Sequence, residues 1–493
     1  MIKHMKVIKI ISVKCIIIFI LIAGYNQQSF SQQDNMIHLL PVIPQSAYTN
    51  PAFKPKAKFY IGFPALSSVY GGLAHNGFAY RHLIQRRADD SLELRMDNMI
   101  GKLANTNYVS ANVSEEILAF GFKARKSYFS FSLSEKITSR VGYPKDLISL
   151  LWKGNSQFIG ETMDLSGINI NAAAYHEISI GYMHDVRIKN QNFVFGGRIK
   201  MLRGLMNVYT QKNDLTIGID DNDYAHTTNT GFQVNMCVPD TLAMNIDSIN
   251  GKDTINEDFN FNPVDFFTNN SNKGFGIDLG VFYKLNSSFS FGASIVDLGY
   301  IKWQTGGGSS VRNYSSNVQD FVFYGIDFND FFGKDDSIVK ENFNEAMDSI
   351  ADIFNVSTTK NSYKAPLPTK IYLTAIYTIT KHDKVGLLMR GDFFNKRLYP
   401  SFTASYNKWF GNMLSAGVSY SVMNRSYMNL GFAMAFNLGP WQTYVATDNI
   451  YCLFDPEGAR TANVHFGINF IFGYKEAKPN YSLLRDTPKE SLK

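Results

Sequence analysis

The sequence has few cysteines, few charged residues and, beyond its first 31 residues, no long apolar run. Three cysteines among 493 residues are too few for a disulfide framework, and no CxxC pair offers a metal site. Charged residues make up 18%, below the ~25% of an average soluble domain. Because no later segment holds about 18 apolar residues without a charge, we expect no membrane-spanning helix in the exported chain.

Motifs of enzymatic chemistry are also missing. There is no GxSxG elbow, P-loop or HExxH zinc helix, since the pair His176-Glu177 lacks a second histidine. The net charge of +6 falls to +2 without the four lysines of the first 14 residues, which excludes a nucleic-acid binder driven by bulk charge. We expect no enzyme, no cofactor, no metal and no nucleic-acid partner.

Residues 1–31 are typical of a secretory signal peptide. A basic stretch is followed by the apolar run Cys15–Gly24 and then by Ser29-Phe30-Ser31, whose small residues suit signal peptidase. A membrane anchor is the alternative, but the apolar run is too short to cross ~30 Å of hydrocarbon. We therefore expect export, with the mature chain starting near Gln32.

The mature chain is rich in the residues of β-sheets and alternates in polarity. The full sequence contains 39 Phe, 27 Tyr and 37 Gly. A period of two places alternate residues on opposite faces of a strand. In one example, Phe275, Ile277, Leu279, Val281 and Tyr283 alternate with Gly274, Gly276, Asp278 and Gly280.

The pattern predicts fourteen strands, and their connections favour a membrane barrel over a soluble sandwich. Many segments are long, and the links after every even-numbered strand are short, whereas all the long links follow odd-numbered strands. Short turns at one end, long loops at the other and an even strand count are typical of outer-membrane barrels. The strands are predicted at 68–80, 116–124, 127–138, 171–187, 192–210, 274–284, 289–304, 369–380, 385–394, 401–408, 413–423, 427–437, 441–449 and 463–473.

Several side chains receive positions in this barrel. The alternation turns five charged residues toward the lumen, where they either bind a solute or satisfy one another; they are Arg198, Lys200, Asp278, Arg390 and Asp392. Trp303, Trp409 and Trp441 stand at strand ends, as in an interfacial girdle. Short outer-loop helices are predicted at 144–152 and 336–354, each a lid or inert loop structure. The acidic link 213–270 is interpreted as a solvated outer loop.

Short motifs resemble known families. Asn50-Pro51-Ala52-Phe53 resembles an N-terminal element of FadL-type and PorV-type outer-membrane barrels. Other motifs resemble an uncharacterised Bacteroidota outer-membrane family, the domain of unknown function 5723; they are Pro144–Leu147, Lys153–Asn155, Gly197-Arg198 with Lys200, Asp297–Gly299 and Thr447–Asn449. Gly467, Phe470 and Phe472 resemble a C-terminal barrel-assembly signal, although Lys475–Lys493 follow it. The resemblance implies an all-β, fourteen-stranded transmembrane barrel in the outer membrane, without a known substrate.

The expected organisation has four parts: a signal peptide (1–31), an N-terminal plug-like segment (32–67), the barrel (68–474) and a polar tail (475–493). Within the plug, Asn50, Pro51, Ala52 and Phe53 are expected to form a fixed turn against the wall. Expected partners are outer-membrane lipid, the barrel-assembly machinery and either a small solute or a secreted protein. Two functions stay open: passive transport of a small or hydrophobic solute in the FadL manner, or a PorV-like interaction scaffold.

Overall fold

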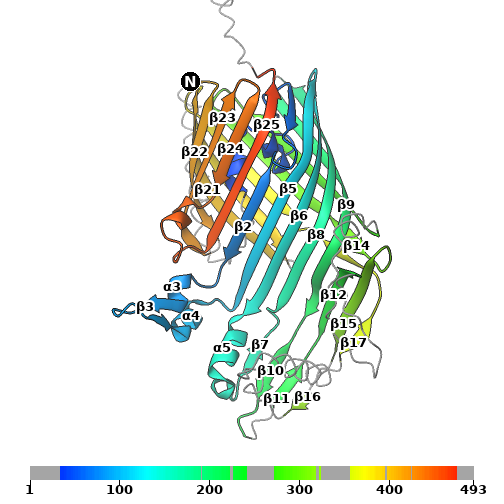
Figure 1. Ribbon diagram of the computed structural model, residues 1–493, viewed down its shortest axis with the longest axis vertical. Helices are drawn as coiled ribbons and strands as arrows, with labels where there is room; N and C mark the ends of the chain where they lie inside the picture. The colour runs from blue at the N-terminus through cyan, green and yellow to red at the C-terminus, as the bar shows by residue number, and fades with distance from the viewer. Residues whose placement is uncertain are drawn as a thin grey trace, which may run out of the picture.

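The chain forms a closed antiparallel β-barrel of fourteen strands, shown by a computed structural model (Figure 1). The structure describes residues 34–189, 191–222, 226–240, 271–317, 321–323, 356–394, 397–423 and 425–474. The first wall position is shared by two short strands, β1 (Phe59–Gly62) and β2 (Val69–His75). The other thirteen are β5 (Thr106–Ala124), β6 (Ser127–Pro144), β8 (Asn169–Ile188), β9 (Gln191–Asn213), β13 (Asn272–Lys284), β14 (Phe289–Trp303), β19 (Lys370–Thr378), β20 (Asp383–Phe394), β21 (Arg397–Phe410), β22 (Leu414–Met423), β23 (Ser426–Leu438), β24 (Trp441–Thr447) and β25 (Thr461–Phe472).

The barrel closes where β1 and β2 lie between the last strand, β25, and β5. Both short strands pair antiparallel with both neighbours, so the wall begins at Phe59. Residues 63–68 interrupt the first strand, but their backbone still bonds to both neighbours, for example from Ala65 N to Ile117 O at 3.0 Å. The interruption turns Ser67 inward, where it is fully buried.

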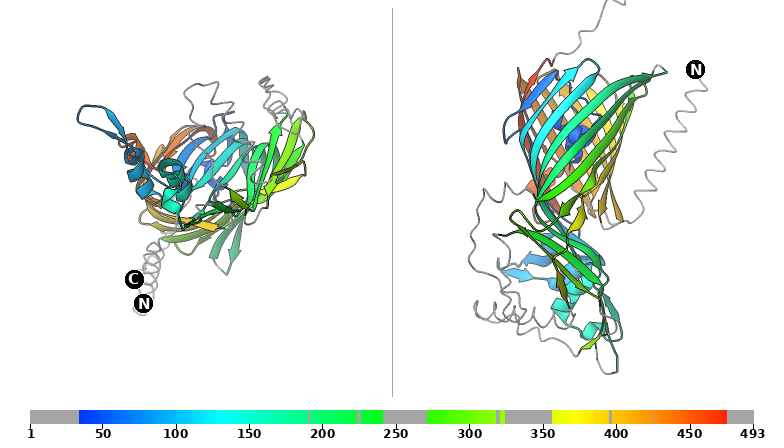
Figure 2. Two further views of the ribbon diagram at one scale, coloured as in Figure 1. Left: turned by 90° about the horizontal axis from the view of Figure 1, so that it is seen from below. Right: turned by 90° about the vertical axis from the view of Figure 1, so that its right-hand side faces the viewer.

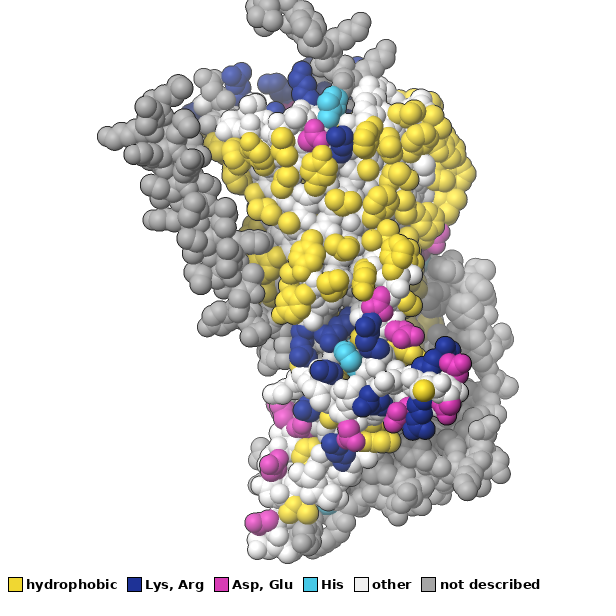
Figure 3. All heavy atoms as spheres, turned by 90° about the vertical axis from the view of Figure 1, so that its left-hand side faces the viewer, with side chains coloured by type: hydrophobic (Ala, Val, Ile, Leu, Met, Phe, Trp, Pro, Cys, Tyr) yellow, Lys and Arg dark blue, Asp and Glu magenta, His cyan; other side chains and the backbone are white. Residues whose placement is uncertain are grey.

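The apolar face of the wall points outward. Large apolar side chains such as Ile199, Phe275 and Val418 are about half exposed, whereas their neighbours along each strand are buried inside. They form a hydrophobic zone around the barrel, and charged side chains gather beyond its lower edge (Figure 3). A sandwich would bury this face, so the arrangement confirms the barrel expected from the sequence.

Beyond one mouth of the barrel, the sheet continues into an extension (Figure 2). The end of β9 pairs with β12 (Phe232–Pro239), which pairs with β15 (Ser309–Ser316) and through it with β17 (Ser357–Thr359). β18 (Tyr363–Pro366) pairs with the end of β14. A second sheet contains β7 (Thr162–Asp164), β10 (Thr216–Ile219), β11 (His226–Asn229) and β16 (Phe321–Phe323). The acidic link is therefore wrongly interpreted as loop alone, because β10, β11 and β12 lie within it.

Helices in the described residues are short, and none is long and apolar enough to cross a membrane. The N-terminal segment contains α2 (Asn35–Leu39) and the 3-10 turn η1 (Pro44–Tyr48). The long links contain α3 (Tyr80–Leu83), the hairpin β3 (Ile84–Arg86) and β4 (Leu92–Leu94), α4 (Met96–Lys102), α5 (Lys145–Lys153), η2 (Ser156–Phe158) and η4 (Ile450–Leu453). Helix α5 confirms the helix predicted after Pro144. The expected helix 336–354, signal peptide 1–31 and tail 475–493 lie outside the described residues.

The predicted tryptophan girdle is wrong at two of its three positions. Trp303 is fully buried in an apolar cluster with Cys237 and Tyr363, and Trp409 is also buried. Trp441 alone of the three is substantially exposed, and its ring packs edge-on against Phe470 at 5.2 Å. Position at a strand end did not reveal which face each ring would occupy.

Candidate functional site in the barrel interior

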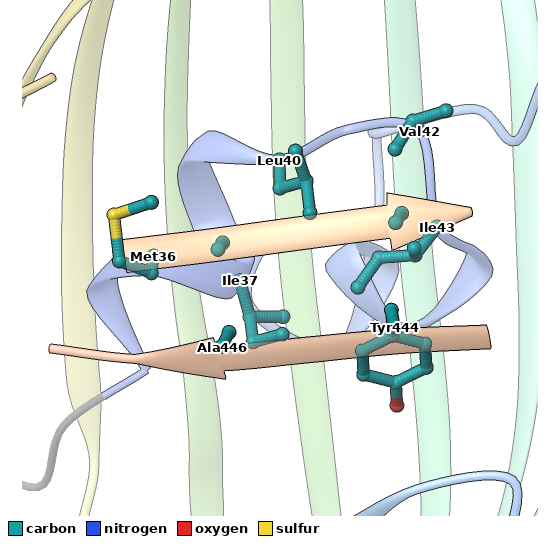
Figure 4. Close-up of a cluster of buried hydrophobic side chains, with 9 residues drawn as sticks. Met36, Ile37, Leu40, Val42, Ile43, Tyr444 and Ala446 are labelled. Carbon is teal, nitrogen blue, oxygen red and sulfur yellow. The ribbon is translucent and has the colours of Figure 1, made fainter. Parts of the chain in front are cut away.

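The interior is occupied by the N-terminal segment, here defined as Asp34–Ala57. Its apolar side chains pack against the inner faces of β23 and β24 (Figure 4). The cluster consists of Met36, Ile37, Leu40, Val42, Ile43, Ala433, Ala435, Tyr444 and Ala446, all buried. An apolar strip on the inner wall therefore matches the apolar residues of the segment.

Hydrogen bonds fix the first turn of the segment. The carboxylate of Asp448, just after β24, accepts bonds from the backbone N–H groups of Asn35 (3.3 Å) and Met36 (2.7 Å). The His38 ring lies 2.9 Å from Thr49 Oγ1 on one side and 2.5 Å from Thr374 Oγ1 on the other. Burial, and secondarily the charge of Arg390, lower the pKa of His38 to about 3, so the ring is neutral at physiological pH.

Asn50–Phe53 form a tight turn on the wall. The Phe53 N–H donates to Asn50 O at 2.9 Å, and the Ala52 N–H donates to Asn50 Oδ1 at 2.9 Å. The Asn50 side chain also donates to Val281 O of β13 at 3.4 Å. All four residues of the turn, including Pro51, are buried. Asparagine supplies the side-chain acceptor and proline fixes the backbone, which explains this local sequence.

Two glycines of the wall make the close approach of this turn feasible. A Cβ atom on Gly196 would lie 2.1 Å from Pro51 O, and one on Gly280 would lie 2.2 Å from Asn50 Oδ1. Both distances are far below van der Waals contact. Only glycine at these positions lets the backbone of the segment rest directly on the strands.

Three of the five charged residues expected in the lumen come together in one buried network. Lys200 Nζ lies 2.8 Å from Asp278 Oδ1, and Arg198 Nη1 lies 3.4 Å from Asp278 Oδ2. Lys200 also reaches Asp297 at 2.5 Å, and Arg198 reaches Glu177 at 3.6 Å. Further ion pairs extend the network, from Lys136 to Glu177 at 2.7 Å and from Lys370 to Asp297 at 3.3 Å.

Irregular strand pairing places the two aspartates of the network beside each other. The register of β13 against β14 shifts between Ile277 and Leu279, and Asp297 has a positive φ of 59°. The shift lets the Asp297 N–H donate to Asp278 Oδ1 at 2.7 Å. A β-bulge commonly re-aims a side chain in this manner, and here it directs both carboxylates toward Lys200.

The network also contacts the N-terminal segment. The Arg198 guanidinium lies over the Tyr48 ring at 4.3 Å, and the Tyr48 hydroxyl donates to Glu116 of β5. Glu116 also accepts from Gln45 at 3.2 Å and from Ser67 at 2.6 Å. The interrupted first strand, the segment and the ionic network therefore meet at one carboxylate. Four cations, Lys136, Arg198, Lys200 and Lys370, face the four carboxylates of Glu116, Glu177, Asp278 and Asp297.

The other two expected lumen residues stand apart. Arg390 and Asp392 of β20 are buried and pair with each other at 3.0 Å, and Arg390 also lies over the Tyr372 ring at 5.4 Å. They lie beside α2 rather than within the larger network, because the Tyr372 ring that Arg390 covers also stacks on the His38 ring at 4.9 Å.

The residues of the expected assembly signal lie on β25 and have local roles in the fold. A Cβ on Gly467 would lie 2.1 Å from Ser67 O, so glycine leaves room for the inward turn of the first strand. Phe470 packs against Trp441, and the exposed Phe472 lies 5.8 Å from Phe59 between ring centroids.

A polar cavity lies inside the barrel among the described residues. Its volume is about 100 Å³, it lies between the segment and the ionic network, and it is lined by groups that include Tyr48, Glu116, Lys136 and Asp297. Toward the extension, the buried cluster around Trp303 and Tyr363 occupies the inner face of the wall. Within the described part of the chain, the lining of the polar cavity consists largely of paired charges and hydroxyl groups.

Sequence reasoning missed Glu116, Lys136, Glu177, Asp297 and Lys370. The period of two would have placed Glu177 and Lys136 in the lumen, because both share the inner face of their strands with small polar residues. Asp297 lies at a β-bulge, where the extra residue shifts the alternation of inward-facing and outward-facing side chains.

The closed wall and polar interior define the class, a fourteen-stranded transmembrane-type β-barrel that is filled by its own N-terminal segment. The chain belongs to the Family of unknown function (DUF5723), whose model matches residues 51–448. Among curated proteins, none matches the chain.

Solved structures similar to this chain include a FadL homologue and two toluene transporters. One is a Pseudomonas aeruginosa FadL homologue, with 8% identity, 88% of this chain and 94% of that chain covered, and a TM-score of 0.38. Another is the Ralstonia pickettii toluene transporter TbuX, with 8% identity, 87% and 94% coverage, and a TM-score of 0.37. A third is the Pseudomonas putida toluene transporter TodX, with 10% identity, 90% and 93% coverage, and a TM-score of 0.32. Similarity at this level does not indicate what the present chain binds.

Proposed function

We propose that this protein is an outer-membrane barrel that is plugged by its N-terminal segment and acts as an interaction scaffold at the cell surface. The observation that carries the proposal is the filled interior. Residues Asp34–Ala57 pack against the inner wall, and the polar cavity between them and the ionic network measures about 100 Å³, which suits structural support better than solute flux. The long links and the extension would then face the outside, and the short turns would face the periplasm.

Exposed apolar side chains on the outer parts support this role. Leu453 and Phe454 of the 450–460 link are 75% and 79% exposed, and Leu92 of β4 is 67% exposed. Ion pairs join these parts, because Arg81 contacts Asp455 and Lys153 Nζ lies 2.9 Å from Asp97 Oδ1. Apolar groups held outside the hydrophobic zone on connected elements are typical of surfaces that bind another protein.

Site-specific photocrosslinking in intact cells tests the scaffold. A photoreactive residue at Phe454 or Leu92 should give discrete crosslinked protein species. The matched control is Lys381, in the exposed turn at the opposite end of the barrel, which should give none of these species. If Phe454 and Leu92 give only lipid adducts, the interaction role is wrong.

Membrane fractionation with gel migration before and after boiling tests the location, and recovery as a soluble periplasmic protein would contradict the barrel in the membrane.

A second candidate function, passage of a small apolar solute, is favoured by one feature of the wall. An apolar groove of about 600 Å³ lies on the outer face of the wall, lined by residues that include Phe195, Gly197, Val281 and Leu373. Gly196 and Gly280 also line this groove, and the turn of the N-terminal segment rests against their inner side. Displacement of that turn would leave only the strands between the groove and the lumen.

One variant tests the plug, and a second separates the two candidate functions. Deletion of residues 34–56 should raise the uptake of small polar solutes by reconstituted vesicles, because it empties the lumen. The second variant is Gly197→Trp, which fills the groove without touching the segment. A transporter would show saturable binding of an apolar fluorescent probe that Gly197→Trp abolishes. The scaffold should show neither saturable binding nor an effect of this substitution.

A further inference from the structure

Outward-facing charged residues form a single row across the wall. The register aligns one residue from each of seven neighbouring strands, in the order Glu115, Glu135, His176, Arg203, Lys273, Lys302 and Lys364. Among the first three, His176 Nδ1 lies at hydrogen-bond distance, 2.5 Å, from Glu135 Oε1. The last four, here called the basic row, carry only positive charge and come from β9, β13, β14 and β18.

The basic row lies at the edge of the hydrophobic zone. Apolar side chains lie two residues away from Arg203, Lys273 and Lys302 along the same strands, toward the short-turn end of the barrel. They are Met201, Phe275 and Tyr300, and they are 52%, 48% and 43% exposed. In the other direction the sheet passes into the extension through the pairing of β9 with β12. The four cations are themselves exposed on the outward face.

Such an arrangement is unfavourable without an anion. Directly opposed side chains on neighbouring strands have Cβ atoms about 5 Å apart, and like charges at that distance repel. The structure pairs Arg203 with Lys273, Lys273 with Lys302 and Lys302 with Lys364. Within the described ranges, no carboxylate lies at ion-pair distance from any of these four residues.

We propose that the basic row binds the phosphate groups of anionic lipid in the outer leaflet. The row faces away from the lumen, beside the apolar side chains that contact acyl chains, so a phosphorylated headgroup reaches it while its tails lie against Met201 and Phe275. Arginine pairs with two phosphate oxygens at once, and flexible lysines add point charges. The inference rests on the membrane orientation proposed above.

The test uses the full mature chain, purified in a neutral detergent and titrated with lipid A that carries two phosphates, with bound lipid counted by native mass spectrometry. The double variant Lys273→Gln/Lys302→Gln should weaken binding about tenfold or more, since it removes two of the four cations that attract the anionic lipid. The matched control is Lys284→Gln, an exposed lysine at the opposite end of the same strand as Lys273. It should bind as the wild type does.

Further measurements identify the ligand group and guard against misfolding. Dephosphorylated lipid A should bind weakly to every variant, and inorganic phosphate at matched concentration should not compete. Equal binding of both lipids, or full competition by free phosphate, would overturn the proposal. Lys302→Arg keeps the charge and should retain binding. Unchanged gel migration before boiling shows that each variant is folded, so lost binding in a folded protein is distinct from failure of the barrel assignment.

Discussion

The backbone N–H of Met36 donates a 2.7 Å hydrogen bond to Oδ1 of Asp448, and this bond ties the start of the N-terminal segment to the end of β24. The same carboxylate accepts from the Asn35 N–H, so it satisfies two otherwise unpaired donors at the start of α2. The barrel therefore holds the segment in the lumen at two places, the first turn of α2 and the turn Asn50–Phe53.

Asp448→Ala should loosen this first turn while the barrel remains inserted. Loss of a side-chain cap of this type costs about 0.5–2 kcal/mol. We expect faster hydrogen exchange at Asn35–Leu40, measured by mass spectrometry in detergent, with unchanged exchange in β23. Asp455→Ala removes a partly exposed carboxylate in the adjacent link and should leave the segment protected. Equal protection in Asp448→Ala would show that apolar packing alone holds α2.

Gly196 and Gly197 are neighbours in sequence with opposite expected tolerance. Gly196→Ala places its Cβ only 2.1 Å from Pro51 O, so it should displace the Asn50–Phe53 turn. At Gly197 the added methyl points outward and has its nearest neighbours at 3.6 Å, so Gly197→Ala should be neutral. Limited proteolysis of the segment in folded protein measures the difference. Similar cleavage of the two variants would contradict the docking of this turn on β9.

Lys200→Met should destabilise the barrel strongly, because it leaves Asp278 and Asp297 without their shared cation. Removing one partner of a buried ion pair costs about 3–5 kcal/mol. Lys212, whose pair with Asp214 at 2.9 Å is more than half exposed, provides the control. Lys212→Met should change stability by about 1 kcal/mol or less. Denaturant titrations of refolded protein in lipid vesicles would compare the two, and equal midpoints would count against the network.

The fold could be predicted from alternation because each wall residue meets either lipid or lumen. Phe275, Ile277 and Leu279 alternate with buried residues as expected, and the same count placed Arg198 and Lys200 inside. The predicted second strand began at 116, whereas β5 begins at Thr106. The outward-facing valines of β5 begin before Glu115 and Glu116. This charged pair interrupts the apolar alternation, so the strand was predicted to start too late.

The arrangement of the candidate site depended on irregular features that alternation cannot predict. Asp297 reaches Lys200 only because of a β-bulge with a positive φ. The residues of the link 63–68 are mostly typical of a loop, so they did not indicate that Ser67 turns inward and donates to Glu116. The motif Asn50–Phe53 indicated a turn, but the glycines that receive it, Gly196 and Gly280, lie on strands that are distant in sequence.

Acid should weaken the folded state through His38. Its folded pKa of about 3 lies below the unfolded value of about 6.5, so the unfolded chain binds the proton first as pH falls. Stability is therefore full above pH ~6.5 and lost below it, by about 2–3 kcal/mol at pH 4.5 for this group alone. His38→Gln should remove this part of the pH dependence of the unfolding midpoint. His382→Gln, in an exposed turn, serves as the control and should keep it.

Phe432→Arg should hinder insertion because Phe432 lies mid-strand on the outward face of β23, between Val418 of β22 and Thr447 of β24. An arginine facing lipid near the middle of the membrane costs about 2–4 kcal/mol, so the folded fraction in vesicles should fall, whereas Phe432→Leu should insert normally.

The adjacent Gly431 faces inward, but the lumen has no room there. A serine Cβ would lie 2.3 Å from Ser419 Oγ and 2.9 Å from Met36 Cγ. Gly431→Ser should therefore insert and yet displace α2, detected as faster hydrogen exchange at Met36. Normal insertion of Phe432→Arg together with failed insertion of Gly431→Ser would mean that the facing of β23 is reversed.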